Sequence, residues 1–469
     1  MIEHEKKIFC NRTLNLYSVQ AIGYDMDYTL IHYNVEEWEY RAFENVKQKM
    51  LSEGFPVENI KFDYSKFTRG LVIDRELGNI IKADKFGYVK KALHGSKQLD
   101  FKEMRRLYSR TTVDLSSSRY SFLNTLFSLS EACLYSELID LLDQGKLPKI
   151  MGYSDLYKKV QKNLDIAHME GALKEEIVAH PENFVDLDPE IPITLLDQKE
   201  CGKKLMLITN SEWPYTKAMM SYAFDRYLPN GMKWQELFHV VVCMARKPDF
   251  FSHNSPFFEV INDEGALMPI NGSFKEKKVY VGGNALKIEE FLGISGDDIL
   301  YVGDHIFSDV NISKSILRWR TALILRELEE ELKFIKQNSE SHAKLQQLMK
   351  LKEDLEMEFF NLRLQLLQKN KKYGMKIDLT QEEIKSKIHE LKDKISELDS
   401  EIGPLAVQDG VDFNNNWGYL LRSGNDKSHL ARQIEKYADI YTSRVSNFMA
   451  YTPFMFFRSY RGTLPHDYL

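Results

Sequence analysis

The sequence predicts an α/β protein in which a large insertion and a long helical hairpin are added to a doubly wound parallel sheet. Short apolar runs with strand character alternate with helical stretches, and this alternation is typical of a doubly wound layer. The first strand ends near Asp25 and the next begins near Leu205. The residues between them are too many for a connection, so they are expected to form an inserted domain. Residues 327–401 are highly charged and helical in period, which predicts the hairpin.

The strands of the predicted sheet are short runs of apolar and β-branched residues. They are expected at residues 19–24, 205–209, 240–243, 279–281, 299–302 and 322–325. Within the insertion, Gly78 and Gly87 stand where chain reversals are needed in residues 71–91, and this pattern predicts a small β-meander. Over residues 123–173 the apolar positions recur with helical spacing, so this part of the insertion is expected to be mainly helical.

The hairpin is predicted from two apolar stripes with coiled-coil spacing. The first stripe comprises Leu345, Leu348, Leu355, Phe359, Leu362 and Leu366, and the second comprises Ile384, Ile388, Leu391, Ile395, Leu398 and Ile402. Between them, a break at Tyr373-Gly374 and a capping-box pattern at Thr380 and Glu383 mark the turn. Such an arm either packs only on itself or makes a contact with a partner or a second subunit.

These features divide the chain into five segments. We expect the first part of the core at residues 1–45, an inserted region with a β-meander and a helical cap at 46–190, the second part of the core at 191–326, the hairpin at 327–403 and a C-terminal segment at 404–469. The aromatic residues of the C-terminal segment are expected to pack on the core or in a subunit interface. A homo-oligomer is expected.

The composition is that of an ordinary soluble globular protein, with 43% hydrophobic and 28% charged residues. The formal net charge of −6 gives no basic footprint for nucleic acid or an anionic membrane, so neither is expected as a partner. The four cysteines show no metal-site spacing and fit a reducing compartment. The most apolar stretch, Phe448–Phe457, contains Pro453 and is far shorter than the ~20 residues that span a bilayer. A cytoplasmic protein is expected.

Four short motifs follow predicted strands, and the carboxyl ends of parallel strands meet in the crevice where ligands bind. The first motif contains Asp25 and Asp27 in the pattern DxDxT. Carboxylate oxygens are the ligands that Mg²⁺ prefers, and an aspartate can attack phosphorus to form an acyl phosphate. The second motif contains Thr209 and Asn210, whose hydroxyl and backbone N–H groups can hold a phosphoryl oxygen, although the same residues also fit a helix N-cap.

The third and fourth motifs supply a positive charge and further carboxylates. Lys247 can neutralise both a phosphate and the attacking carboxylate. Gly303 allows a close approach of the backbone, and Asp304 would complete the ligand set of the metal. Asp309 would orient Asp304 or Lys247 from behind. Each motif alone also fits a surface loop or a solvated side chain, whereas the four together, each after a strand, predict a phosphatase.

In this order the four motifs resemble those of the haloacid dehalogenase superfamily of phosphatases. Longer stretches resemble the cytosolic purine 5′-nucleotidase family, the type specific for inosine and guanosine monophosphates. The resemblance covers most of the chain and is carried by ARKPDFF around Lys247, VYVGGNA, ILYVGDHIFSDV, WRTALIL, RYSFLNTLFSLSE, DIAHMEGALKE and WGYLLRSGNDKSHLARQIEKYADIY. The hairpin is the least informative part of it.

The resemblance implies hydrolysis of purine nucleoside 5′-monophosphates, with IMP and GMP preferred, through a phosphoaspartate. Asp25 would be the nucleophile, Asp27 the general acid and base, and Lys247 a catalytic cation. Mg²⁺ would be held by Asp25, by the backbone carbonyl of Asp27 and by Asp304. A nucleoside that replaces water as the acceptor would make the enzyme a phosphotransferase as well.

In the inserted cap, the resemblance implies that Phe127 stacks on the base. It also implies polar contacts from Asp165, His168 and Lys174 to the nucleotide. Asp165 and His168 are three residues apart and share one face of a helix, but Phe127 also fits a core position and His168 a helix surface. The family pattern has an arginine where this chain has Gln161, which can donate to a carbonyl but carries no charge, so the base preference is open.

Two alternative functions fit the same residues. One is a phosphatase of this superfamily that acts on another phosphorylated metabolite, and Gln161 is the residue that favours it. The other is a non-catalytic interaction protein that uses the hairpin as its binding element. The complete set of catalytic carboxylates, together with Lys247, argues against the second alternative.

Overall fold

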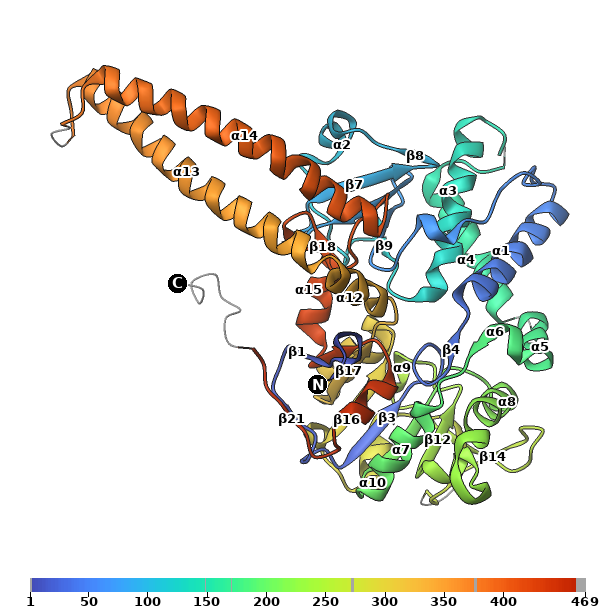
Figure 1. Ribbon diagram of the computed structural model, residues 1–469. Coiled ribbons are helices and arrows are strands. Elements are labelled where there is room, and N and C mark those ends of the chain that lie inside the picture. Colours follow the sequence, from blue (N-terminus) through green and yellow to red (C-terminus); the bar gives the residue numbers. More distant parts are fainter. Residues whose placement is uncertain (1, 148, 170, 271–273, 375–377, 461–469) are drawn as a thin grey trace. The chain divides into compact units, whose positions relative to one another are not determined.

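The computed structural model describes residues 2–147, 149–169, 171–270, 274–374 and 378–460 (Figure 1). The chain forms two compact units. The first unit comprises residues 1–329 and 420–469, and the second comprises residues 330–419. Among the described residues, no helix combines the length and the apolar character that crossing a bilayer requires.

The first unit is built on a mixed sheet whose central strands are parallel. From one edge to the other its order is β1 (Phe9–Cys10), β20 (Ile440–Thr442), β17 (Arg320–Ile324), β16 (Ile299–Gly303), β3 (Ala21–Tyr24), β11 (Lys204–Ile208), β12 (Val240–Cys243), β15 (Lys278–Gly282), β13 (Phe257–Val260) and β14 (Leu267–Pro269). Neighbouring strands from β20 to β15 are parallel, whereas β1, β13 and β14 pair antiparallel at the two edges. The predicted α/β class with a doubly wound parallel sheet is confirmed.

The central parallel strands, from β17 to β12, are buried on both faces along nearly their whole length, which explains their nearly continuous apolar sequences. Every residue of β12 and β16 is buried. Phe251, Ile288, Tyr301 and Trp319 belong to one core cluster against this sheet. The helices of this part of the chain are α7 (Glu190–Glu200), α8 (Trp213–Phe224), α9 (Asp249–Ser252), α10 (Ala285–Leu292), α11 (Ile312–Leu317) and α15 (His429–Tyr437).

Four strands of the sheet, β1, β20, β13 and β14, were not predicted from the sequence. Each has at most four residues. Strand β20 comes from the C-terminal segment, where it pairs with β17 on one side and β1 on the other. Strands this short contain too few residues for a recognisable alternation of apolar and polar positions. The C-terminal segment is therefore part of the core sheet.

The inserted region combines an antiparallel sheet with a group of helices. The sheet has the order β8 (Lys97–Gln98), β7 (Val89–His94), β6 (Asn79–Ala83), β5 (Val72–Asp74) and β9 (Tyr120–Phe122), and its strands β5, β6 and β7 form the predicted meander. The helices are α1 (Val35–Ser52), α2 (Phe101–Tyr108), α3 (Leu129–Asp143), α4 (Tyr153–Met169), α5 (Gly171–Ala179) and α6 (Pro181–Phe184). Helices α1, α3 and α4 pack together (Figure 1). The boundary expected between residues 45 and 46 lies inside α1, because this helix is continuous.

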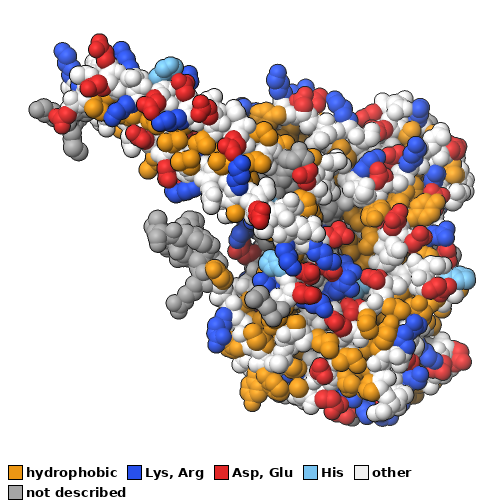
Figure 2. Space-filling model, viewed as in Figure 1, with side chains coloured by type: hydrophobic (Ala, Val, Ile, Leu, Met, Phe, Trp, Pro, Cys, Tyr) orange, Lys and Arg blue, Asp and Glu red, His pale blue; other side chains and the backbone are white. Residues whose placement is uncertain are grey.

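The second unit contains a hairpin of two long helices, α13 (Ser339–Lys371) and α14 (Gln381–Phe413), which lie side by side (Figures 1 and 2). Thr380 caps α14: its Oγ1 accepts from the N–H of Glu383 at 3.2 Å. The boundary expected at residue 403 lies inside α14, because this helix continues through Pro404 to Phe413. Proline removes only one backbone hydrogen-bond donor from the helix, and the turns on both sides of it stay helical. The apolar seam between the helices consists of Leu355, Phe359, Leu362, Leu366, Ile384, Ile388 and Leu391.

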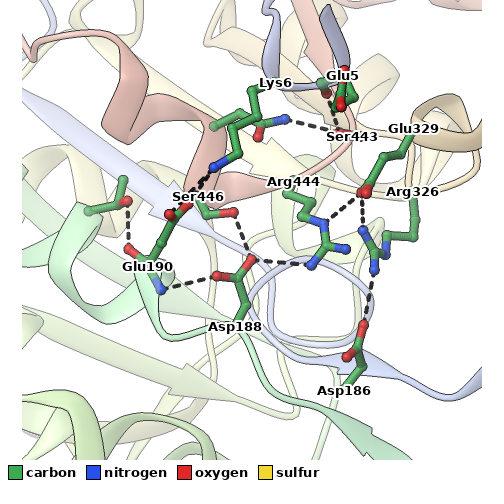
Figure 3. Close-up of polar contacts among 12 residues, drawn as sticks. Glu5, Lys6, Asp186, Asp188, Glu190, Arg326, Glu329, Ser443, Arg444 and Ser446 are labelled. Carbon is green, nitrogen blue, oxygen red and sulfur yellow. Dashed lines mark hydrogen bonds and ion pairs between the residues drawn. The ribbon is translucent and has the colours of Figure 1, made fainter. Parts of the chain in front are cut away.

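A network of ion pairs holds the end of the insertion against the core of the first unit (Figure 3). The insertion returns through β10 (Val185–Asp186), which pairs with β4 (His32–Tyr33). Arg326, shortly after β17, donates to Asp186 at 3.0 Å and pairs with Glu329. Arg444, shortly after β20, lies 2.8 Å from Glu329 and 3.5 Å from Asp188. Two arginines at the carboxyl ends of core strands therefore fasten the insertion where it rejoins the sheet.

Candidate active site

The four sequence motifs meet at one edge of the central sheet. Strands β16, β3, β11 and β12 are consecutive neighbours and run parallel. Asp304, Asp25 and Thr209 directly follow β16, β3 and β11, and the loop after β12 leads to Lys247. Because the strands point the same way, their carboxyl ends bring these four residues into a common crevice, as the sequence predicts.

A buried ammonium group lies at the centre of this crevice. Lys247 Nζ is 2.7 Å from Asp25 Oδ1 and 2.8 Å from Asp309 Oδ1, and it donates to Tyr301 Oη at 3.1 Å. The Lys247 side chain is only 2% exposed. Burial by itself lowers the pKa of Lys247, but Asp25 and Asp309 outweigh that effect and raise the pKa well above its usual value. The site therefore contains a permanent positive charge.

Asn210 fixes the loop that carries Lys247. Its Oδ1 accepts from the N–H of Lys247 at 2.6 Å, and its Nδ2 donates to the Lys247 carbonyl at 3.2 Å. Thr209, which is fully buried, accepts from the N–H of Ser211 at 3.0 Å through Oγ1 and from the N–H of Ala245 through its carbonyl. The side chain of Asn210 thus has a structural use that the sequence did not suggest.

Three buried carboxylates face one another beside the ammonium. One oxygen each from Asp25, Asp304 and Asp309 lies within 4.8 Å of the others. Burial raises the pKa of Asp304 to about 7, and Arg69 opposes this shift. Burial likewise raises the pKa of Asp25 well above its usual value, and Lys247 opposes the shift. A divalent cation would stabilise the charged carboxylates, so this donor set fits a hard cation such as Mg²⁺.

Asp309 is engaged with other partners. Its Oδ1 faces Lys247 at 2.8 Å, and its Oδ2 accepts from the N–H of His305 at 3.1 Å. This leaves Asp25 and Asp304 as the carboxylates that would hold a cation. Asp309 thus contacts Lys247 directly, and the sequence analysis proposes that it orients Lys247 or Asp304.

Both carboxylate oxygens of Asp27 accept hydrogen bonds from side chains. Tyr33 donates to Oδ1 at 2.5 Å, and Ser211 donates to Oδ2 at 2.8 Å. Tyr215 in turn donates to the hydroxyl of Tyr33 at 3.0 Å. Sequence reasoning did not find these three partners. Ser211 belongs to the Thr-Asn-Ser motif, but the two tyrosines come from β4 and α8 and carry no signal of their own.

The insertion reaches the site through Arg69 and Thr125. Arg69 donates to the backbone carbonyl of Asp304 at 2.9 Å and makes two hydrogen bonds to Glu327, at 2.9 and 2.6 Å. Thr125 donates to Asp304 Oδ2 at 3.1 Å. Arg69 is only 1% exposed, and its guanidinium therefore acts inside the protein. In the sequence, Arg69 stands out only as a charged residue close to the apolar run LVI.

The predicted substrate residues fall into two groups. Phe127 packs on Tyr28 of the nucleophile loop, with ring centroids 4.5 Å apart, and Lys174 Nζ lies 5.2 Å from the ring centroid of Tyr215. These two are thereby connected to the surroundings of Asp25 and Asp27. Gln161 and Asp165 lie on the exposed side of α4. His168 belongs to α4 as well, but its side chain is outside the described residues.

Replacement of Gly303 by alanine should destabilise the site. An added Cβ would lie 2.5 Å from Asp309 Oδ2 and 2.7 Å from Asp309 Cβ. We expect Gly303→Ala to lower the free energy of unfolding by about 1–3 kcal/mol, because a core without spare volume has to shift. Gly403→Ala is the control, since a Cβ there meets nothing within 4 Å. Urea titration followed by fluorescence measures both, and equal stabilities of Gly303→Ala and wild type would contradict the geometry.

Comparison with known proteins places the whole chain in one family. The profile of the 5′ nucleotidase family matches residues 8–469. A 5′-nucleotidase domain-containing protein of Dictyostelium discoideum is 28% identical over 480 residues, which cover 98% of this chain and 75% of the relative. Two solved structures are similar to this chain. One is a haloacid dehalogenase-like hydrolase of Xanthomonas campestris, with 11% identity, a TM-score of 0.24, and coverage of 65% of this chain and 82% of that chain. The other is a 2-haloacid dehalogenase of Pseudomonas syringae, with 14% identity, a TM-score of 0.22, and coverage of 65% of this chain and 86% of that chain. The chain belongs to the 5′ nucleotidase family and is a 5′-nucleotidase enzyme.

Proposed function

We propose that this enzyme hydrolyses purine nucleoside 5′-monophosphates, with IMP and GMP preferred, through a phosphoaspartate on Asp25 and with the aid of Mg²⁺. The observation that carries the proposal is the buried ammonium of Lys247, 2.7 Å from Asp25 and 2.8 Å from Asp309. A carboxylate attacking a dianionic phosphate needs a fixed positive charge on the approach side, and this ion pair provides one.

In the first step, an oxygen of Asp25 attacks phosphorus while the bond to the ribose 5′-oxygen breaks. Thr209, the N–H of Asn210 and Lys247 stabilise the charge on the equatorial phosphate oxygens. Asp25, Asp304 and the backbone carbonyl of Asp27 would hold Mg²⁺, which would supply positive charge beside the phosphate when bound. Each of these groups belongs to a strand end or to the loop that follows, so the sheet itself sets their positions.

Asp27 transfers the protons of the reaction. It protonates the leaving 5′-oxygen in the first step, and it then removes a proton from the water that hydrolyses the phosphoaspartate. The hydrogen bonds from Tyr33 and Ser211 hold its carboxylate in one orientation while its protonation changes. A nucleoside in place of water takes the phosphoryl group instead, which gives a phosphotransferase activity.

The insertion supplies the nucleoside pocket in this proposal. Phe127 provides an aromatic face for the base, and its contact with Tyr28 supports this role because Tyr28 belongs to the nucleophile loop. Lys174, Asp165 and His168 contribute polar contacts to the nucleotide. Gln161 donates to the 6-oxo group of the base. A phosphatase for a different phosphorylated metabolite is the runner-up, since the exposed Gln161 lacks the charge of the arginine in the family pattern.

Asp25→Asn tests the nucleophile. An amide oxygen does not form the acyl phosphate, so turnover should fall by at least about 10³-fold. Asp309 still pairs with Lys247 in this variant, so the ammonium keeps a charged partner and the unfolding transition should stay close to that of the wild type. Steady-state phosphate release and thermal unfolding are measured on the same preparation. Full turnover by a folded Asp25→Asn protein would exclude the phosphoaspartate scheme.

Tyr33→Phe tests the orientation of Asp27. The variant loses the 2.5 Å hydrogen bond to Asp27 but keeps the ring, so kcat should fall by roughly 10- to 100-fold with a much smaller change in KM. Tyr215→Phe is the matched control, because it removes only the bond to the Tyr33 hydroxyl and should cost no more than about threefold. Equal kcat values for Tyr33→Phe and wild type would mean that the hydrogen bond from Tyr33 does not orient Asp27 for catalysis.

A panel of IMP, GMP, AMP, CMP and UMP, each with Mg²⁺ and with chelator, tests the substrate class and the metal. We expect metal-dependent phosphate release that is strongest for IMP and GMP. Gln161→Arg should lower KM for these two by roughly three- to tenfold, because a charged donor binds a carbonyl more strongly, and should leave AMP unchanged. If none of the five nucleotides releases phosphate in the presence of Mg²⁺, the proposed substrate class is wrong and another phosphorylated metabolite is the substrate.

A further inference from the structure

The first helix of the hairpin carries a second apolar stripe. Met357, Phe360, Leu364 and Leu367 are 65%, 56%, 49% and 47% exposed. They follow one another at intervals of three, four and three residues, which is the spacing of a helix-packing seam. Apolar side chains are visible along the hairpin between its charged residues (Figure 2).

This stripe does not face α14. The seam toward α14 contains Leu355, Phe359 and Leu362 among its residues. Met357 and Leu364 follow seam residues by two positions, which is about 200° around the helix axis, whereas Phe360 and Leu367 follow seam residues by one position, which is about 100°. The middle of the stripe therefore lies about 150° around α13 from the seam, on the side that faces away from α14.

The stripe is self-complementary in an antiparallel pairing of two α13 helices. If Phe360 lies opposite Leu364 of a second copy, then Met357 lies opposite Leu367, because three residues backward on one helix correspond to three residues forward on the other. Two-fold symmetry repeats each of these layers. The result is four apolar layers without a gap, which is the pattern of a coiled-coil interface.

The charges at the two ends of the stripe fit the same register. One further step of four residues along each helix places Glu353 opposite Lys371 of the second copy, once at each end. Both side chains are exposed on α13. Opposite charges therefore bound the apolar layers on both sides, and a parallel pairing would instead place Glu353 beside Glu353 and Lys371 beside Lys371.

We propose that the stripe is the interface through which a second copy of this chain binds, with α13 packed antiparallel on α13. The four helices then form a layer in which the two α13 helices are central and the two α14 helices are outermost. This inference is independent of the proposed substrate and mechanism, because it concerns only the hairpin and is measured by mass.

The first test is the molar mass of the full-length protein in solution. Sedimentation equilibrium at micromolar concentrations should give a dimer, or a larger assembly that contains this interface. Leu364→Glu should halve the mass of the particle, since it places two like charges in the central layers. Leu351→Glu is the matched control: Leu351 is also 49% exposed but lies on the other side of α13, so the wild-type mass is expected. A wild-type monomer, or an unchanged mass for Leu364→Glu, would overturn the proposal.

Reversal of the end charges tests the register. Glu353→Lys alone and Lys371→Glu alone each place like charges together, and each should raise the dimer dissociation constant by roughly tenfold. The double variant Glu353→Lys/Lys371→Glu restores opposite charges and should return the constant to near the wild-type value. A double variant that dissociates more readily than either single variant would overturn the antiparallel arrangement. A monomeric wild-type protein whose stripe binds a helix of a different protein would overturn it as well.

Discussion

The ion pair between Lys247 and the carboxylates of Asp25 and Asp309 is the interaction on which the rest of the site depends. A buried charge is tolerated only when its partners are fixed, and a buried charge left without any partner typically costs about 3–5 kcal/mol. The surrounding structure is arranged to fix them. Asn210 holds the backbone of Lys247, and the absence of a side chain at Gly303 makes room for Asp309. In the proposed mechanism, the same arrangement that stabilises the ammonium would also present it to the substrate phosphate.

The insertion and the core share the site at the level of single hydrogen bonds. Arg69 and Thr125 from the insertion both bind Asp304, one at its carbonyl and the other at its carboxylate. On the other side, Phe127 packs against Tyr28. A movement of the insertion relative to the sheet therefore changes the surroundings of the carboxylate that would hold the metal, as well as those of the proposed nucleoside pocket. In the proposed mechanism, catalysis and substrate binding would be connected through these contacts.

Much of the core of the site was predictable from the sequence, because each of the four motifs directly follows an apolar strand and parallel strands end at one edge. The partners of Asp27 were not predictable. Tyr33 and Tyr215 are separated by the whole insertion and meet only after folding, and an isolated tyrosine in a sequence gives no signal of such a contact. The strand β20 was not predicted for a related reason: its three residues form a strand only through their pairing with the neighbouring strands of the sheet. The uses of Gln161, Asp165 and His168 depend on a bound ligand and stay predictions.

The position of β20 in the sheet has a consequence for biosynthesis. This strand lies between β17 and β1, so the first residues of the chain find their partner only when residues 440–442 have been made. Until then one side of β17 presents unpaired backbone groups, and exposed strand edges promote association with other chains. The hairpin is synthesised in this interval, and its contacts are local, so it can fold first. The sheet is thus closed last, from its carboxyl-terminal strand, and a nascent chain that stalls within the hairpin leaves the ribosome-bound protein with an open edge.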